Sequence, residues 1–363
     1  MKVAIISLNS ESSKMIGESC KKYFSQVDMI NLKEIEVHVD GNGIEVLHNG
    51  EKLKAYDCVY CRASYKYVLL TRSLTSALKD KCYMPLSASS FTIGHDKFLT
   101  QLSLQKYNVD MPKTYLAGNT LNAKEILKNI HYPAIIKIPS GTHGKGVMFA
   151  DSMQSAKSLL DTMDVFKQPV IIQEYIETNA TDIRVLVVGG KVVGCMKRKA
   201  GKDELRANIH MGGTGKKHSL SDDAEKMAVR ASVAVKADIC AIDLLEKGKD
   251  YKVIEVNVSP GIQGLTKATG KDIAGEIAKT LFEKTKEWKN KHDNLHYKEM
   301  VKDMKNSEEK EIATTLDIKA GIIKLPSIVT QLSGFGVEDN VHIKVKKGKI
   351  VVDKSFSLEK KNS

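Results

Sequence analysis

Oxygen-bearing side chains that could bind a metal ion are concentrated between Ala241 and Gly270. They are Asp243, Glu255 and Asn257. Carboxylate and amide oxygens are hard ligands that suit Mg²⁺, an ion that also holds substrate phosphates. A carboxylate within an apolar sheet is unfavourable unless it is paired or bound to a metal. These residues therefore indicate a metal site or, as the alternative, a solvated hairpin face with ordinary acidic residues.

The elements that would position these side chains are the two strands of a predicted hairpin. Apolar runs over Ala241–Leu245 and Lys252–Val258 flank a polar turn at Glu246–Asp250. Alternation along the second run places every other residue on one face. That face is expected to carry Val253, Glu255 and Asn257. Asp243 should project from the first strand onto the same face, so that two carboxylates and an amide oxygen converge.

A glycine-rich loop, SGTHGKG, follows a strand-like run that carries Lys137. The spacing of Gly141, Gly144 and Gly146 lets backbone N–H groups approach an anion. The loop is not a P-loop, because the G-K-[ST] ending and the following helix are missing, and a strand-like run over Val147–Ala150 follows instead. The pattern suits a flap that closes over phosphates, with a mobile hairpin turn as the alternative.

The composition sets the class of protein. A chain of 363 residues with 42% hydrophobic residues is too long for one compact core and should form two or three domains. No apolar run approaches the roughly 20 residues that span a bilayer, and the first residues do not read as a signal peptide. The net charge of +12 favours anionic partners such as nucleotides, nucleic acid or acidic peptides. The lysines are dispersed, which is typical of a solvated surface.

The six cysteines are scattered, and only Cys58 and Cys61 form a C-x-x-C. That pair falls in a strand-like run where alternation points the two thiols to opposite faces. No second pair completes a zinc site. We therefore expect core thiols in a reducing cytoplasm, and a cytoplasmic protein without membrane contact.

Strand-like and helix-like runs alternate along the first 287 residues, which predicts an α/β (α+β) fold. The further expected strands are Lys2–Ser7, Ile35–Val39, Ile44–His48, Cys58–Arg62, Pro133–Ile138, Val170–Gln173, Asp182–Val188 and Lys191–Lys199. The expected helices are Glu11–Phe24, Leu69–Lys79, Phe98–Tyr107, Thr120–Asn129, Ser155–Met163, Asp222–Ala237 and Lys271–Glu287. Glu204–Gly213 should be a loop that handles anions. Residues 288–311 are expected to be a charged helix or linker, and 312–363 a small β-rich domain.

The hairpin residues, Lys137 and the glycine loop belong to a longer ordered set of residues that resembles the RimK-like branch of the ATP-grasp ligases. The ordered set is Asp96-Lys97, Ile136-Lys137 with the glycine loop, Gln173-Glu174-Tyr175-Ile176, Asp182-Ile183-Arg184, Arg206-Ala207-Asn208, Asp243, Glu255-Val256-Asn257 and Ser259-Pro260-Gly261. The likeness runs from about residue 1 to 287 and includes Asp57 and Arg62. It implies an N-terminal pre-ATP-grasp α/β domain over 1–92 and an ATP-grasp domain over 93–287, whose two subdomains clasp ATP.

The resemblance implies a role in nucleotide binding for several residues. Lys97 and Lys137 would bind phosphates, as compact cations do, under the loop of Gly141, Gly144 and Gly146. Backbone groups of Glu174, Tyr175 and Ile176 would contact adenine. Glu177 or Asp182 would hold the ribose, with an exposed acid at a strand end as the alternative for both.

The resemblance also implies the catalytic set. Asp243, Glu255 and Asn257 would hold two Mg²⁺ (or Mn²⁺) ions. Arg206 and Asn208 would be the catalytic residues that reach the phosphate and the acyl intermediate, and they would contact ATP together with Ala207. Candidates of second rank are Arg184, Arg198 and His210, for which strand-face cations and a surface loop residue are the alternatives.

The implied reaction joins a carboxylate and an amine. The carboxylate attacks the γ-phosphate of ATP to give an acyl phosphate, and the amine then displaces phosphate. Within the family the amine is often that of L-glutamate, added to a protein C-terminus or a glutamyl coenzyme. Ala207 and Met211 depart from the family pattern in the loop nearest the substrate, which leaves the acceptor open.

The tail over 313–355 is similar to the swapped-hairpin AbrB-like fold, through Ile322–Pro326 and the hairpin Val341–Val352. The similarity implies a homo-oligomer, with nucleic-acid binding through the lysines of the hairpin as the less favoured interpretation. A nucleotide-sensing DNA-associated regulator is therefore the alternative to the ligase. A kinase-like phosphotransferase is a third option.

Overall fold

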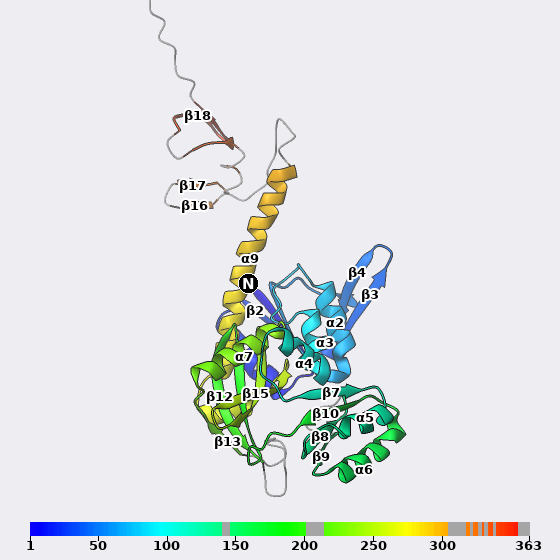
Figure 1. Cartoon of the computed structure of the whole chain (residues 1–363). Coiled ribbons are helices and arrows are strands. Elements are labelled where there is room, and N and C mark those ends of the chain that lie inside the picture. Colours follow the sequence, from blue (N-terminus) through cyan, green and yellow to red (C-terminus); the bar gives the residue numbers. More distant parts are fainter. Residues whose placement is uncertain are drawn as a thin grey trace, which may run out of the picture. The chain divides into compact units, whose positions relative to one another are not determined.

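The computed structural model describes residues 1–139, 146–200 and 214–303, with shorter parts of the C-terminal segment at 317–319, 322–325, 329, 333–336 and 339–354. The chain divides into two compact units, Met1–Lys289 and Asn290–Ser363. Figure 1 shows the elements of each unit. Within the described ranges, no helix has the length and apolar character needed to cross a bilayer.

The chain begins with a parallel sheet of three strands in the order β2 (Gln26–Asn31), β1 (Lys2–Ser7) and β6 (Cys58–Arg62). The central strand is a continuous apolar run with both faces buried, as parallel sheets require. Further elements of this region are β3 (Ile35–Asp40), β4 (Gly43–His48), β5 (Glu51–Lys52), α1 (Glu11–Cys20), α2 (Val68–Ala77), α3 (Ala88–His95), α4 (Lys97–Lys106) and the 3₁₀ turns Leu32–Glu34 and Tyr65–Tyr67.

A second sheet has four antiparallel strands in the order β7 (Thr114–Ala117), β10 (Val170–Glu174), β8 (Ala134–Lys137) and β9 (Val147–Ala150). Helices α5 (Thr120–Leu127) and α6 (Met153–Met163), the latter followed by a 3₁₀ turn at Asp164–Phe166, cover one face of it (Figure 1). Ile136, Leu160 and Ile172 belong to a separate hydrophobic core between these helices and the sheet.

The third sheet positions most of the candidate site. It has five antiparallel strands in the order β13 (Thr214–Lys217), β12 (Lys191–Lys199), β11 (Thr181–Val188), β14 (Ile239–Lys247) and β15 (Asp250–Asn257). The helices α7 (Asp222–Ala234), α8 (Gln263–Thr269) and α9 (Ile273–Asp303) complete this region.

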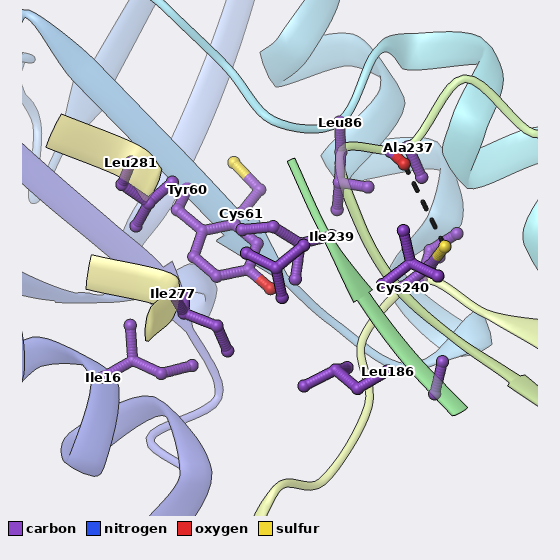
Figure 2. Close-up of a cluster of buried hydrophobic side chains, with 14 of the residues drawn as sticks. Ile16, Tyr60, Cys61, Leu86, Leu186, Ala237, Ile239, Cys240, Ile277 and Leu281 are labelled. Atoms are coloured by element: carbon purple, nitrogen blue, oxygen red, sulfur yellow. Dashed lines mark hydrogen bonds between the residues drawn. The ribbon is translucent and has the colours of Figure 1, made fainter. Parts of the chain in front are cut away.

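One hydrophobic core joins the third sheet to the N-terminal sheet. Figure 2 shows side chains from both: Ile16 of α1, Tyr60 and Cys61 of β6, Leu186 of β11, Ile239 and Cys240 of β14, and Ile277 and Leu281 of α9. The six cysteines are free and buried, as expected. The domain boundary at residue 92 stays a prediction.

The second unit contains two antiparallel pairs, β16 (Asp317–Lys319) with β17 (Ile322–Lys324), and β18 (Val341–Lys346) with β19 (Lys349–Lys354). The fold is therefore mixed α/β with a small additional C-terminal β segment, as predicted. Helix α9 continues through the expected linker as far as Asp303, and residues 304–311 lie outside the described ranges. The likeness to AbrB-like domains stays a prediction.

Candidate active site

The hairpin of β14 and β15 brings the three predicted metal ligands to one face. Asp243 lies directly opposite Glu255, and Ala241 lies opposite Asn257. Opposed residues of an antiparallel pair point to the same side, and so do residues two apart. Asp243, Glu255 and Asn257 therefore share a face, as the sequence indicated.

The prediction for Val253 is wrong. The register shifts between Asp243 and Leu244, so that Leu244 pairs with Val253 and Ile254 is left as the extra residue of a bulge. The bulge reverses the alternation, and Val253 is fully buried whereas Glu255 is exposed.

The carboxylate of Asp243 is buried and held by two arginines. Arg184 on β11 donates from Nε and Nη2 to its two oxygens at 2.8 and 2.7 Å. Nη2 of Arg198 on β12 lies 2.9 Å from Oδ2. Burial raises the pKa of Asp243, but the two guanidinium groups outweigh it and hold that pKa below its usual value. Asp243 is therefore ionised and fixed in orientation.

Arg198 links Asp243 to a second buried carboxylate. Its Nε and Nη2 each lie 2.6 Å from an oxygen of Asp182. Burial and the charge of Asp243 raise the pKa of Asp182 to about 6, against the opposite effect of Arg198. The ribose role of Asp182 stays a prediction, and here its carboxylate binds Arg198. Arg184 and Arg198 are thus more than strand-face cations, because they form one ionic network with two acids.

Lys97 and Lys137, the two lysines predicted to bind phosphates, interact electrostatically with Glu255. Lys137 Nζ donates to Gln173 Oε1 at 2.5 Å, and Gln173 Nε2 donates to Thr114 Oγ1 at 2.8 Å. Burial lowers the pKa of Lys137 to about 8, with Glu255 raising it and Lys97 lowering it. Burial also lowers the pKa of Lys97, which Glu255 raises. Both ammonium groups are partly desolvated and interact with Glu255, so that a bound anionic group would favour their charged forms.

The predicted adenine segment follows β10. The N–H of Glu174 donates to Lys113 O at 2.8 Å, and its carboxylate accepts from Lys252 Nζ at 3.1 Å. The Tyr175 ring meets Phe149 of β9 edge-on at 5.1 Å between centroids. Ile176 is buried.

The second ribose candidate, Glu177, is exposed and accepts a hydrogen bond from the Tyr175 hydroxyl at 3.0 Å. The segment from Glu174 to Glu177 therefore places one aromatic ring and two acids at the end of β10, an inner strand of the four-stranded sheet. The adenine and ribose roles stay predictions.

Several predicted site residues lie outside the described ranges: Gly141, Gly144, Arg206, Ala207, Asn208 and His210. Gly146 is described and has φ +74°, where a Cβ would lie 2.5 Å from Cγ1 of Ile138. Glycine is therefore required at position 146, directly before β9.

Sequence reasoning missed the contacts that fix the loop after β15. Arg62 of β6 donates to Pro260 O at 2.7 Å, and the N–H of Ala63 donates to Ser259 Oγ at 3.1 Å. Ser259 N in turn donates to Asn257 Oδ1 at 2.9 Å. The signal in the sequence for Arg62 was that the likeness to the RimK-like family includes this residue.

The donor set fits Mg²⁺. In the part of the chain that the structure describes, no three His, Cys, Asp or Glu side chains gather as a complete metal cage. The face of Asp243 and Glu255 offers two carboxylates and one amide oxygen, as suits an ion that keeps water and phosphate ligands. Asp243 has about four lone-pair positions, and the arginines take three.

Comparisons with known proteins show the family of the chain. The sequence model of one family, described as the RimK-like ATP-grasp domain, matches residues 94–281. A relative in Cellvibrio japonicus (strain Ueda107), named "Probable alpha-L-glutamate ligase", is 32% identical over 292 residues, which cover 79% of this chain and 97% of the relative.

Solved structures share the fold. The ATP-grasp ligase PsnB, in complex with a phosphomimetic variant of a minimal precursor, Mg and ADP, has a TM-score of 0.62 at 15% identity, covering 78% of this chain and 98% of PsnB. The RimK domain protein from Sphaerobacter thermophilus DSM 20745 has a TM-score of 0.61 at 15% identity, covering 77% and 99%.

The fold and the match to this family define an ATP-grasp ligase, an enzyme class that forms carbon–nitrogen bonds. The chain belongs to the RimK-like ATP-grasp family.

Proposed function

We propose that this ligase uses ATP and Mg²⁺ to join the amino group of L-glutamate to the carboxylate of an acceptor, a protein C-terminus or a glutamyl coenzyme. The observation that carries the proposal is the shared face of Asp243, Glu255 and Asn257 beside Lys97 and Lys137. The names of the relatives support glutamate as the amine.

In the proposed reaction the acceptor carboxylate attacks the γ-phosphate, releasing ADP and leaving an acyl phosphate. The glutamate amine then attacks the acyl carbon and phosphate departs, so that an amide forms. Lys97 and Lys137 would hold the phosphates, and Arg184 and Arg198 keep Asp243 ionised and oriented. Mg²⁺ (or Mn²⁺), proposed as two ions on the acidic face, would neutralise charge on the phosphates.

Self-association and a cytoplasmic location are also part of the proposal. In the second unit, Val341, Ile343 and Val345 lie on one face of β18 and are exposed. An isolated two-stranded hairpin is marginal in water, so an apolar face on one supports burial against a second copy. The alternative, a DNA-associated regulator, would bind duplex DNA with a steep salt dependence and would form no amide.

The test is mass spectrometry of reactions with ATP, Mg²⁺, L-glutamate and a panel of glutamyl coenzymes, acidic peptides and cytosolic protein. We expect one acceptor to gain the mass of a glutamate residue with the wild type. Glu255→Gln should abolish the gain, because Glu255 is exposed and its loss removes a ligand without disturbing the buried network. Glu276→Gln, an exposed change on α9, is the matched control and should keep activity.

Two results would contradict the proposal. Full activity of Glu255→Gln would remove the acidic face from the mechanism. A wild type that binds ATP but adds no mass to any acceptor would refute glutamate as the amine or the acceptor class.

A further inference from the structure

A hollow of about 440 Å³ lies at the carboxyl ends of the parallel strands of the N-terminal sheet. Its lining includes Asn9 after β1, Asn31 at the end of β2, and Lys33, Tyr65, Lys66 and Tyr67. In open sheets of parallel strands, ligands bind in the crevice at this end. The volume is in the range of small-ligand sites. None of the residues given a role in the proposed reaction belongs to this lining.

The hollow is basic. Lys33 and Lys66 are exposed, and in the described ranges neither ammonium group has an ion pair or hydrogen bond. No acidic residue is among those that line the hollow in the described structure. The neighbouring Glu34 is engaged, because it accepts from Asn31 Nδ2 at 3.3 Å and lies 3.2 Å from His48 Nε2. Two cations are therefore available to carboxylates of a ligand.

The polar groups of the hollow suit a peptide. The amide of Asn9 can donate and accept hydrogen bonds, as a peptide backbone requires, whereas the amide of Asn31 is engaged, since its Oδ1 accepts from Lys33 N at 3.2 Å and its Nδ2 donates to Glu34. Tyr65 and Tyr67 add aromatic surface with hydroxyl groups. Nucleic acid would instead need a longer row of cations along its backbone.

A short chain of contacts connects the hollow to the acidic face of Asp243, Glu255 and Asn257. Ser64 lines the hollow and directly follows Ala63, whose N–H bonds Ser259 Oγ at 3.1 Å. Ser259 N bonds Asn257 Oδ1, on the acidic face. Arg62 also contacts the loop after β15, because it donates a hydrogen bond to Pro260 O. A ligand segment in the hollow would therefore lie next to the loop that leaves β15.

We propose that this hollow binds the acidic segment of the acceptor polypeptide that precedes its reacting carboxylate. The proposal rests on the proposed function and adds to it a binding site for the acceptor that lies outside the face of Asp243, Glu255 and Asn257. Lys33 and Lys66 attract the side-chain carboxylates, and Asn9 holds the backbone.

The test uses fluorescein-labelled tetraglutamate, with binding followed by anisotropy in the absence of ATP. Lys33→Glu/Lys66→Glu should raise the Kd about tenfold, because two attractions become repulsions, and added salt should reduce the difference. Lys79→Glu/Lys106→Glu changes net charge equally at exposed positions outside the hollow and should bind as the wild type does. The affinity for ATP should be unchanged in both variants.

The failure of this inference and that of the proposed function are distinguishable. A wild type that binds tetraglutamate through these lysines but adds no glutamate to it supports the hollow as a site for acidic peptides and contradicts the proposed function. A wild type that extends tetraglutamate with the same KM in both double variants overturns the hollow and keeps the ligase. No binding of tetraglutamate, or binding of an equally long DNA oligomer in its place, also overturns the hollow.

Discussion

Raising the pH from 7 to 9 should weaken ATP binding about tenfold through Lys137. Burial lowers the pKa of this ammonium to about 8 in the free protein. Lys137 is then mostly charged at pH 7 and mostly neutral at pH 9. Bound phosphates favour the charged form, so binding above pH 8 must take up a proton. The charged fraction falls about tenfold between the two pH values, which corresponds to about 1.4 kcal/mol. The lowered pKa of Lys97 acts in the same direction.

The assay is titration calorimetry of ATP with Mg²⁺ at pH 7, 8 and 9. Lys137→Arg stays charged throughout and should show a much shallower loss of affinity. Lys128→Arg, at the exposed end of α5, is the control and should keep the wild-type profile. A wild-type affinity that is constant from pH 7 to 9, or an equally steep profile for Lys137→Arg, would refute the reasoning.

Two further predictions concern stability. Arg198→Met should lower the free energy of unfolding by about 3 kcal/mol, measured with urea, because Asp182 and Asp243 lose a shared buried cation. Adding Asp182→Asn should restore part of the lost stability. A loss below about 1 kcal/mol in Arg198→Met would contradict the network. Gly146→Ala should cost about 1 kcal/mol, seen as a lower thermal midpoint, because its φ is +74° and Ile138 fills the space of a Cβ; an unchanged midpoint would disprove this.

The sequence predicted the elements whose signal is local. The strands Lys2–Ser7, Cys58–Arg62, Val147–Ala150 and Lys191–Lys199 have the predicted bounds, because each contains an apolar run that local periodicity detects. The face of Asp243, Glu255 and Asn257 was also predictable, since a hairpin fixes the register of its own strands. The roles of the glycine loop and of Arg206 stay predictions.

Other features depend on distant parts of the chain. The bulge at Ile254 breaks the alternation that local periodicity assumes. The edge strand β13 is polar, and the edge strand β2 is half polar, so that neither was predicted as a strand. The arginines of β11 and β12 meet Asp243 only because β11 lies between β12 and β14, an order that no local pattern determines.

The contacts of Arg62 and Ser12 with the loop after β15 also bear on how the protein is made. Arg62 precedes its partner Pro260 by 198 residues in the sequence, and Ser12 precedes its partner Gln263 by 251 residues. At roughly 5–20 residues per second, about 10–40 s of synthesis separates Arg62 from Pro260. The N-terminal sheet therefore emerges from the ribosome long before the loop and helix that complete its core. Over that interval its apolar residues lack their native cover, and the nascent chain is exposed to chaperones and proteases.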